Sequence, residues 1–455
     1  MKRSLTSYIV PVVIVGLLLA MAACPLVAQG QAVAPSVLLP AATTTTQRAV
    51  EQPPQKLLLT KGDRVVIIGD SITAQLIYSR YIEDYLLMCV PQLELSAAQL
   101  GRAGEQAMQF LNRIDRDLVP QKPTVVTICY GMNDGGYRPF DEYIRDYYTK
   151  NMTELVKRVK ATGARVIVGS PGAVDTFYYN RGQPVTPDIY NNSLAQLGAI
   201  GRTIAAEQGE HFANLHDPMM RSMAAAKAAA KPELAVCGLD GVHPGPNGHL
   251  LMAAAFLKAM GFDGDIGTIT IDLKGQSKAS AGHKVISAKG GAVTIESTRY
   301  PFCFLGGGGD NSARSMLPYC DFNQKLNRLT LVVKGLGTTK GKVTWGSASK
   351  TFTRQQLEAG INLADEFLDN PFTKAFEAVD RLVAGKQAFE TTLTHSYTFV
   401  VADLVNVPGV QNDAKAMDAI KTLQSRAMSL YEPYRKCVQG VVKPVTHTIT
   451  VTPQD

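Results

Sequence analysis

The sequence predicts an α/β protein in which a parallel sheet carries helices on both faces. Two observations lead to this fold class. Between residues 60 and 262, short apolar runs alternate with longer segments of helical periodicity, which is the pattern of repeated strand–helix units. Beyond Phe262, short strand-like runs follow one another with Gly and Lys turns between several of them. We therefore expect a three-layer α/β/α domain followed by a C-terminal region that is β-rich and then helical.

The first part of the chain justifies this prediction element by element. The run at 65–68 is continuously apolar, as in strands that are buried on both faces, and the segment 147–162 is amphipathic, with Lys and Arg on its wet face. The expected elements are strands at 65–68, 93–95, 124–130, 165–169 and 212–215, and helices at 78–90, 107–118, 147–162, 190–208 and 248–260.

The C-terminal part has a different composition of elements. We expect strands at 268–273, 284–286, 292–296, 329–333, 342–345 and 446–452, and helices at 354–367, 371–384 and 414–430. Carbohydrate binding, formation of a lid and simple packing are all compatible with such a region, and packing is the favoured role. The predicted division is an α/β domain at 59–263 and an accessory region at 264–455.

The N-terminus resembles an export signal. Lys2 and Arg3 precede an apolar stretch at 9–23 that ends in small residues. Cleavage near residue 28 would remove a signal peptide of residues 1–28. Alternatively, Met21-Ala-Ala-Cys24 resembles a lipobox, and cleavage before Cys24 would leave a lipid anchor on that cysteine. Either way we expect an exported protein, which is periplasmic, anchored to the outer membrane or extracellular. Residues 29–58 lack apolar periodicity and are expected to form a flexible linker.

Composition excludes one class of function. The chain has 455 residues, of which 45% are hydrophobic and 19% charged, and its net charge is +7. This charge is spread along the chain, whereas nucleic-acid binding proteins gather basic residues into a stripe or a recognised module. We therefore expect no nucleic-acid partner and interpret the charge as a solvated surface.

Seven cysteines are present, and six remain if Cys24 is set aside. An exported protein can form disulfides, although the sequence does not choose among the pairings. Cys303 and Cys320 flank a glycine-rich loop and are the expected bridge, whereas Cys129 lies in an apolar run where a buried free thiol is at least as reasonable. No cysteine or histidine cluster has the spacing of a metal site, so we expect neither a metal nor a cofactor.

Two separated segments carry the residues of a serine nucleophile. Ser71 lies in Gly69-Asp70-Ser71, directly after the first apolar run, and this position places its hydroxyl at the carboxyl end of a strand. Asp240 and His243 lie three residues apart in Asp-Gly-Val-His. A serine hydroxyl becomes a good nucleophile when an imidazole takes its proton and a carboxylate orients that imidazole. We therefore predict Ser71 as nucleophile, His243 as general base and Asp240 as the residue that orients it.

Two further blocks, with Gly104 in LGRAGE and Asn133 in YGMND, lie between these segments in the sequence. The four blocks in this order resemble the SGNH branch of the GDSL hydrolases over residues 60–262. The resemblance implies a three-layer fold, ester hydrolysis and an oxyanion hole made by the amides of Ser71 and Gly104 and the side chain of Asn133. One position departs from the family, because Gln99 stands where members often have asparagine.

Several polar residues near these blocks have simpler interpretations. Asp70 is expected to fix its loop as a hydrogen-bond acceptor, and Gly131 and Asp134 to shape their turn. His249 is expected to be a satisfied or surface histidine. Four tyrosines follow predicted strands and are either sugar-stacking residues or ordinary half-buried ones; they are Tyr137, Tyr178, Tyr179 and Tyr190.

These observations predict a secreted serine esterase for small acyl esters. Acetyl on a polysaccharide is the favoured substrate, because the signal indicates export and the short block spacing leaves little apolar lining for a long acyl chain. One alternative is a lipid esterase of the lysophospholipase or thioesterase type. Another is a catalytically retired, carbohydrate-binding protein of the cell envelope, although such a protein would have no need of all four blocks.

Overall fold

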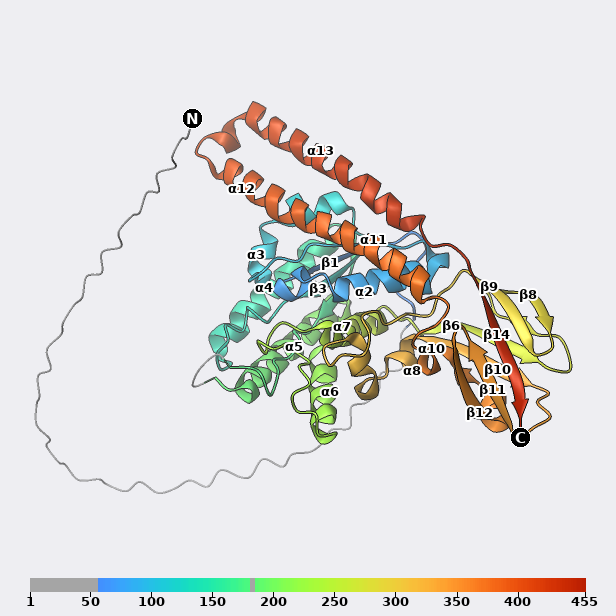
Figure 1. The fold of residues 1–455 in the computed structure, drawn as a ribbon. Helices are drawn as coiled ribbons and strands as arrows, with labels where there is room; N and C mark the ends of the chain where they lie inside the picture. Colours follow the sequence, from blue (N-terminus) through green and yellow to red (C-terminus); the bar gives the residue numbers. More distant parts are fainter. Residues whose placement is uncertain (1–55, 181–184) are drawn as a thin grey trace, which may run out of the picture. The chain divides into compact units, whose positions relative to one another are not determined.

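A computed structural model describes residues 56–180 and 185–455 (Figure 1). Its first sheet has five parallel strands in the order β2-β1-β3-β4-β5. Their bounds are Arg64–Gly69 for β1, Ser96–Gln99 for β2, Val125–Cys129 for β3, Arg165–Gly169 for β4 and His211–Ala213 for β5. The predicted parallel sheet is confirmed, and β2 is one of its two edge strands.

The interior strand β1 is buried on both faces, which explains its continuous apolar run. Val65 and Ile67 contribute to one hydrophobic cluster, and Val66 and Ile68 contribute to the other. Successive side chains of a strand point to opposite faces, so a strand covered on both sides is apolar at successive positions.

Helices cover the two faces of this sheet (Figure 1). The helices are α1 (Ser71–Ala74), α2 (Tyr78–Asp84), α3 (Ala107–Leu111), α4 (Glu142–Lys160), α5 (Pro187–Gln208), α6 (His216–Ala228) and α7 (Pro246–Ala259). Phe110 of α3 and Met152 of α4 belong to the same cluster as Val66. Ile82 of α2 and Phe256 of α7 belong to the opposite cluster. The three-layer prediction is therefore confirmed.

Some predicted elements are wrong in detail. The strand expected at 93–95 is absent, because Pro91–Leu93 forms a 3-10 turn and Glu94 adopts a left-handed backbone with φ of 50°. The helix expected at 78–90 ends at Asp84 and continues as a π-helical turn over Tyr85–Cys89. Similarly, a π-helical turn over Ile114–Leu118 follows the short α3.

The C-terminal region contains two further sheets. A four-stranded sheet has the order β13-β10-β6-β7, and a five-stranded antiparallel sheet has the order β12-β11-β14-β9-β8. The strands are β6 (Asp265–Asp272), β7 (Lys278–Ala279), β8 (His283–Lys289), β9 (Ala292–Ser297), β10 (Arg328–Lys334), β11 (Lys340–Trp345), β12 (Ala348–Thr353), β13 (Ile361–Asn362) and β14 (Val445–Gln454). The last strand, β14, lies between β11 and β9, so the predicted β-rich region is confirmed.

Most of the helices in this region are inserted between β13 and β14. The inserted helices are α10 (Leu363–Glu366), α11 (Thr373–Thr392), α12 (Thr398–Asn406) and α13 (Ala414–Gln439), whereas α8 (Phe322–Leu326) and α9 (Arg354–Ala359) precede β13. The single helix expected at 354–367 is interrupted at Gly360, whose φ of 100° is incompatible with a helix. The long α11 packs against α13 and also against α2 and β2 of the first sheet (Figure 1).

One hydrophobic cluster extends from the parallel sheet into the C-terminal region. It contains Val65 and Phe256 together with Ile266, Val293 and Leu329 from β6, β9 and β10. The two parts of the chain are therefore joined by a continuous apolar core.

The expected bridge between Cys303 and Cys320 is wrong. Both carry free thiols, as do the four other cysteines among the described residues. Cys303 is buried, and its Sγ lies 3.5 Å from the carbonyl oxygen of Pro301. Burial raises the pKa of Cys303 to about 12 and that of Cys320 to about 11, which disfavours the reactive thiolate.

The predicted signal peptide at 1–28, with Cys24, and most of the predicted linker at 29–58 lie outside the described residues. Across 56–180 and 185–455, no helix combines the length and the apolar character needed to cross a membrane.

Candidate active site

Ser71 lies at the carboxyl end of β1, as the first residue of the short helix α1. The turn is fixed by Asp70, whose Oδ1 accepts a 2.9 Å hydrogen bond from the amide of Ile72. Complete burial raises the pKa of Asp70 to about 7. Asp70 therefore acts as a helix cap that holds the serine loop, in agreement with its expected role.

Ser71, His243 and Asp240 are brought together into one hydrogen-bonded chain. The Oγ of Ser71 lies 2.9 Å from Nε2 of His243, and Nδ1 of His243 lies 2.6 Å from Oδ2 of Asp240. Because a carboxylate can only accept, Nδ1 carries the ring proton and Nε2 presents its lone pair to the serine. This arrangement can move a proton from the serine hydroxyl to the imidazole.

Asp240 is itself held by backbone amides. Its Oδ1 accepts hydrogen bonds of 2.9 Å from the amides of Val242 and His243. Burial by itself raises the pKa of Asp240, but the hydrogen bonds from the His243 ring and from both amides outweigh burial and lower the pKa below its usual value. The side chains of Asp240 and His243 remain 50% and 34% exposed. The site is therefore open to solvent.

A neighbouring loop fixes the backbone of the Asp240–His243 segment. The amide of Asp175 donates to the carbonyl of Gly241 over 2.8 Å, and Oδ2 of Asp175 accepts from the amide of Cys237 over 3.1 Å. Gly241 has a φ of 76°, and a Cβ there would lie 2.3 Å from the Cα of Tyr179. Only glycine fits this position, where the loop at 175–179 packs on the Asp240–His243 segment.

Gly104 lies on the loop that follows β2. Its φ of 71° is a left-handed conformation, and a Cβ there would meet no protein atom within 4 Å. Glycine is therefore favoured here by the positive φ and not by steric contact with neighbouring protein atoms. The side of Gly104 on which a Cβ would stand is therefore open.

A buried ion pair holds the far side of this loop. Arg113 donates to Oε1 of Glu105 over 2.7 Å and to Oε2 over 2.6 Å, and it also donates to the carbonyl of Leu100 over 2.6 Å. Burial alone lowers the pKa of Arg113, but the carboxylate of Glu105 outweighs it and raises the pKa. Such a bidentate, buried ion pair has little conformational freedom. Because Arg113 binds Glu105 and also the carbonyl of Leu100, it fixes both ends of the Leu100–Glu105 segment.

The side-chain amide of Asn133 is oriented from both ends. Its Nδ2 donates to the carbonyl of Glu105 over 3.1 Å, and its Oδ1 accepts from the hydroxyl of Tyr137 over 3.3 Å. An amide nitrogen carries two hydrogens, so one remains for a substrate oxygen after the bond to Glu105. The contact to Glu105 also couples Asn133 to the loop that carries Gly104.

Asp134 shapes the turn around Asn133, as expected. Its Oδ2 accepts from the amide of Gly131 and its Oδ1 from the amide of Ala107, each over 3.0 Å. Burial raises the pKa of Asp134 to about 6. This carboxyl therefore ties the Asn133 block to the start of α3.

Sugar stacking requires an exposed aromatic ring, and two of the four tyrosines considered for this role lack one. Tyr179 and Tyr190 are buried, so that role is wrong for both. Tyr190 instead stacks on the ring of Tyr137 with centroids 5.0 Å apart, and its hydroxyl donates to the carbonyl of Met132. Tyr137 has an unusual positive φ of 54°, which this stacking helps to hold.

Two exposed apolar side chains beside the site were not singled out from the sequence. Phe177, in the loop that packs on the Asp240–His243 segment, is 57% exposed, and Leu239, directly before Asp240, is 73% exposed. Leu239 directly precedes Asp240, the predicted orienting aspartate, whereas no comparable signal in the sequence pointed to Phe177.

His249 is not a second base. It is fully buried, its Nδ1 accepts from the amide of Tyr78 over 3.3 Å, and its Nε2 lies 3.1 Å from Oε1 of Gln75. Burial lowers the pKa of His249 to about 3, so the ring stays neutral. The expectation of a satisfied histidine is confirmed, although its position is interior.

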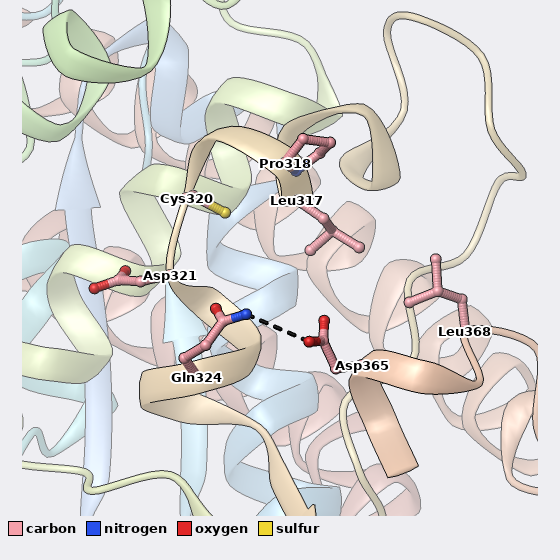
Figure 2. Close-up of a pocket in the computed structure, with 7 residues that line it drawn as sticks. All are labelled: Leu317, Pro318, Cys320, Asp321, Gln324, Asp365 and Leu368. Atoms are coloured by element: carbon pink, nitrogen blue, oxygen red, sulfur yellow. Dashed lines mark hydrogen bonds between the residues drawn. The ribbon is translucent and has the colours of Figure 1, made fainter. Parts of the chain in front are cut away.

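A hollow of about 610 Å³ lies elsewhere on the chain (Figure 2). Its lining contains neither Ser71 nor His243. The carboxylate of Asp365 accepts from Asn323 over 2.8 Å, and that of Asp321 lies 2.6 Å from the Nζ of Lys258, so both acids already have partners. The lining residues are Leu317, Pro318, Cys320, Asp321, Gln324, Asp365 and Leu368. Within the described ranges, no group of three or more His, Cys, Asp or Glu side chains is placed to hold a metal ion.

The chain is similar to proteins of a known family. Residues 67–251 match the GDSL-like lipase/acylhydrolase family. This part of the chain is a GDSL-like lipase/acylhydrolase domain. An acetylxylan esterase of Geobacillus stearothermophilus is 25% identical over 224 residues, which cover 44% of this chain and 95% of the relative.

The fold recurs in a solved structure, that of a gut microbial diltiazem-metabolizing enzyme. The two chains are 23% identical, the TM-score is 0.66, and the match covers 87% of this chain and 98% of the other. Most of the C-terminal region is therefore part of the shared fold. The predicted resemblance to the GDSL hydrolases is confirmed, and the protein is an ester-hydrolysing enzyme.

We expect Tyr137→Phe to lower kcat about 2- to 10-fold with little change in KM, because one neutral hydrogen bond contributes about 0.5–1.5 kcal/mol. The variant removes only the hydroxyl that orients Asn133, and the ring that stacks on Tyr190 is retained. Steady-state kinetics with p-nitrophenyl acetate measure the effect, with the exposed Tyr143→Phe as control. An unchanged kcat in Tyr137→Phe would show that the amide is oriented without this hydroxyl.

Proposed function

We propose that the protein is an exported serine esterase that removes small acyl groups, acetyl above all, from a carbohydrate. The single observation that carries the proposal is the hydrogen-bonded chain from Ser71 through His243 to Asp240. A retired esterase would have no chemical need to keep this chain aligned, which disfavours a purely carbohydrate-binding role.

Acylation begins when Nε2 of His243 takes the proton of Ser71 and Oγ attacks the ester carbonyl carbon. Asp240 keeps the imidazole in the required tautomer and stabilises the imidazolium that forms. The tetrahedral intermediate then collapses, the bond to the alcohol breaks, and His243 returns the proton to the leaving oxygen. Water repeats the cycle on the acyl-enzyme and releases the carboxylic acid.

The negative oxygen of the intermediate requires donors that are already in place. We assign this role to the amides of Ser71 and Gly104 and to Nδ2 of Asn133. Removal of one such donor typically costs about 100- to 1000-fold in kcat. The fixed orientation of Asn133 supports this assignment, since a donor that needs no reorganisation is worth most in the transition state.

Two observations support a small acyl group on a carbohydrate. Asp240 and His243 are open to solvent, which suits an ester carried on a polymer better than a buried tunnel would. The relative that covers the domain is named as an acetylxylan esterase. The export signal expected at residues 1–28, or a lipid anchor on Cys24, would place the enzyme where such polymers occur.

Ser71→Ala is expected to abolish measurable turnover while the fold survives, because it removes the nucleophile and only one oxygen atom.

Two aspartates near Ser71 and His243 give a matched pair of variants. Asp240→Asn should lower kcat by about 10⁴-fold through loss of the tautomer, whereas Asp70→Asn, which keeps the acceptor for Ile72, should retain most turnover. Hydrolysis of p-nitrophenyl acetate and thermal unfolding measure these effects. Full activity in Ser71→Ala would exclude it as nucleophile.

A second prediction concerns the acyl chain. If the site accepts only small groups, kcat/KM should fall steeply from acetate to octanoate p-nitrophenyl esters, since each poorly fitted methylene costs about 1–3 kcal/mol. The same preparation should release acetate from acetylated xylan. A preference for octanoate would contradict the acetyl assignment and favour a lipid esterase, with Ser71 and His243 unaffected.

A further inference from the structure

The edge of the parallel sheet is closed by side chains of a helix from the C-terminal region. The outward carbonyl of Ala97 in β2 accepts a 2.7 Å hydrogen bond from Nζ of Lys386. The outward amide of Gln99 donates to Oε2 of Glu390 over 3.0 Å. Lys386 and Glu390 are one turn apart on α11, and Nζ of Lys386 donates to Oε1 of Glu390 over 2.6 Å. An edge strand exposes unpaired backbone groups, and this pair supplies the partners that a sixth strand would have supplied.

The side chain of Gln99 continues this contact toward the active site. Its Nε2 donates to the carbonyl of Gln387 over 3.3 Å and to Oγ1 of Thr391 over 3.0 Å, both on α11. Its Oε1 accepts from the amide of Gly101 over 2.9 Å. Glutamine is one methylene longer than asparagine, and this length lets one side chain join α11 to the loop that leads to Gly104.

The contact is buried and fully paired, which gives it a fixed geometry. Lys386 also pairs with Glu83 of α2 over 2.9 Å, and Gln387 donates to Glu83 over 2.8 Å. The hydroxyl of Tyr431 on α13 donates to Glu390. Burial raises the pKa of Glu83 to about 7. All five side chains are almost inaccessible to solvent, so loss of one member would leave a desolvated group without its partner.

The loop that follows Gln99 is held by close contacts at both of its ends. A Cβ on Gly101 would lie 2.4 Å from the amide nitrogen of Ala74 in α1, so this part of the loop touches the helix that begins with Ser71. At its other end, Arg113 holds Glu105. A displacement of the end of β2 would therefore move the Gly104 amide relative to Ser71.

We propose that α11 is a positioning element of the esterase site, in which Lys386, Gln387 and Glu390 act through Gln99 to set the place of the Gly104 amide. The inference rests on the proposed function, because Gly104 matters here as a donor to the oxyanion. It makes the C-terminal region a working part of the enzyme and not an appendage.

The test uses full-length variants. Gln99→Leu removes every polar contact of this side chain at similar volume, and Thr391→Val removes one of its partners. Glu377→Gln, on an exposed part of the same helix, is the control. We expect kcat on p-nitrophenyl acetate to fall about 10- to 100-fold in Gln99→Leu, because a donor displaced by a fraction of an ångström loses its effect. Thr391→Val should lose less, and KM should change little in both.

A second measurement separates positioning from loss of stability. An alkylboronic acid forms a tetrahedral adduct with an active-site serine and therefore needs the same oxyanion donors. Its affinity should fall in proportion to kcat/KM in Gln99→Leu. Glu390→Gln, which keeps an acceptor for the Gln99 amide, should retain more kcat and more boronate affinity than Glu390→Leu.

Thermal unfolding of each variant shows whether it is folded at the assay temperature, and Thr391→Val decides the matter if Gln99→Leu does not fold. Unchanged kcat and boronate affinity in the folded variants would overturn the inference. If that result came together with an inactive Ser71→Ala, the proposed function would stand and only the role of α11 would fall. An active Ser71→Ala would overturn both.

Discussion

The hydrogen bond between Ser71 and His243 is the constraint on which the rest of the structure depends. It joins two residues 172 positions apart over 2.9 Å, and a shift of about 1 Å at either end can cost a hundredfold in rate. The parallel strand β1 and the cap at Asp70 fix the serine. The contacts of Asp175 with the segment at 237–241 fix the histidine. Much of the domain can be understood as the support for this one contact.

The loop that carries Gly104 is supported from two directions by different parts of the chain. Arg113 and Glu105 belong to the hydrolase domain itself, whereas Gln99 depends on α11, nearly 300 residues further along. Buried charged groups are costly to desolvate and tolerate little change in geometry. Their use on both sides of one short loop is consistent with a need to hold the loop still.

Much of the fold and of the candidate site could be predicted from the sequence, because those features depend on local patterns. The apolar run of β1 indicated a strand buried on both faces, and four short blocks indicated Ser71, Gly104, Asn133 and the Asp240–His243 pair. The remainder depends on contacts between distant residues. Gln99 appeared only as a departure from a family pattern, because its partners on α11 are not visible from its neighbours. The disulfide expected between Cys303 and Cys320 was wrong because proximity to a glycine-rich loop does not bring two thiols together.

The most direct test of the proposed mechanism is the structure of the enzyme after reaction with diethyl p-nitrophenyl phosphate, which leaves a tetrahedral phosphoryl group on an activated serine. We expect phosphorus on Oγ of Ser71. One phosphoryl oxygen should lie about 2.7–3.1 Å from the amides of Ser71 and Gly104 and from Nδ2 of Asn133. An adduct on another side chain, or an oxygen that faces away from these three donors, would contradict it.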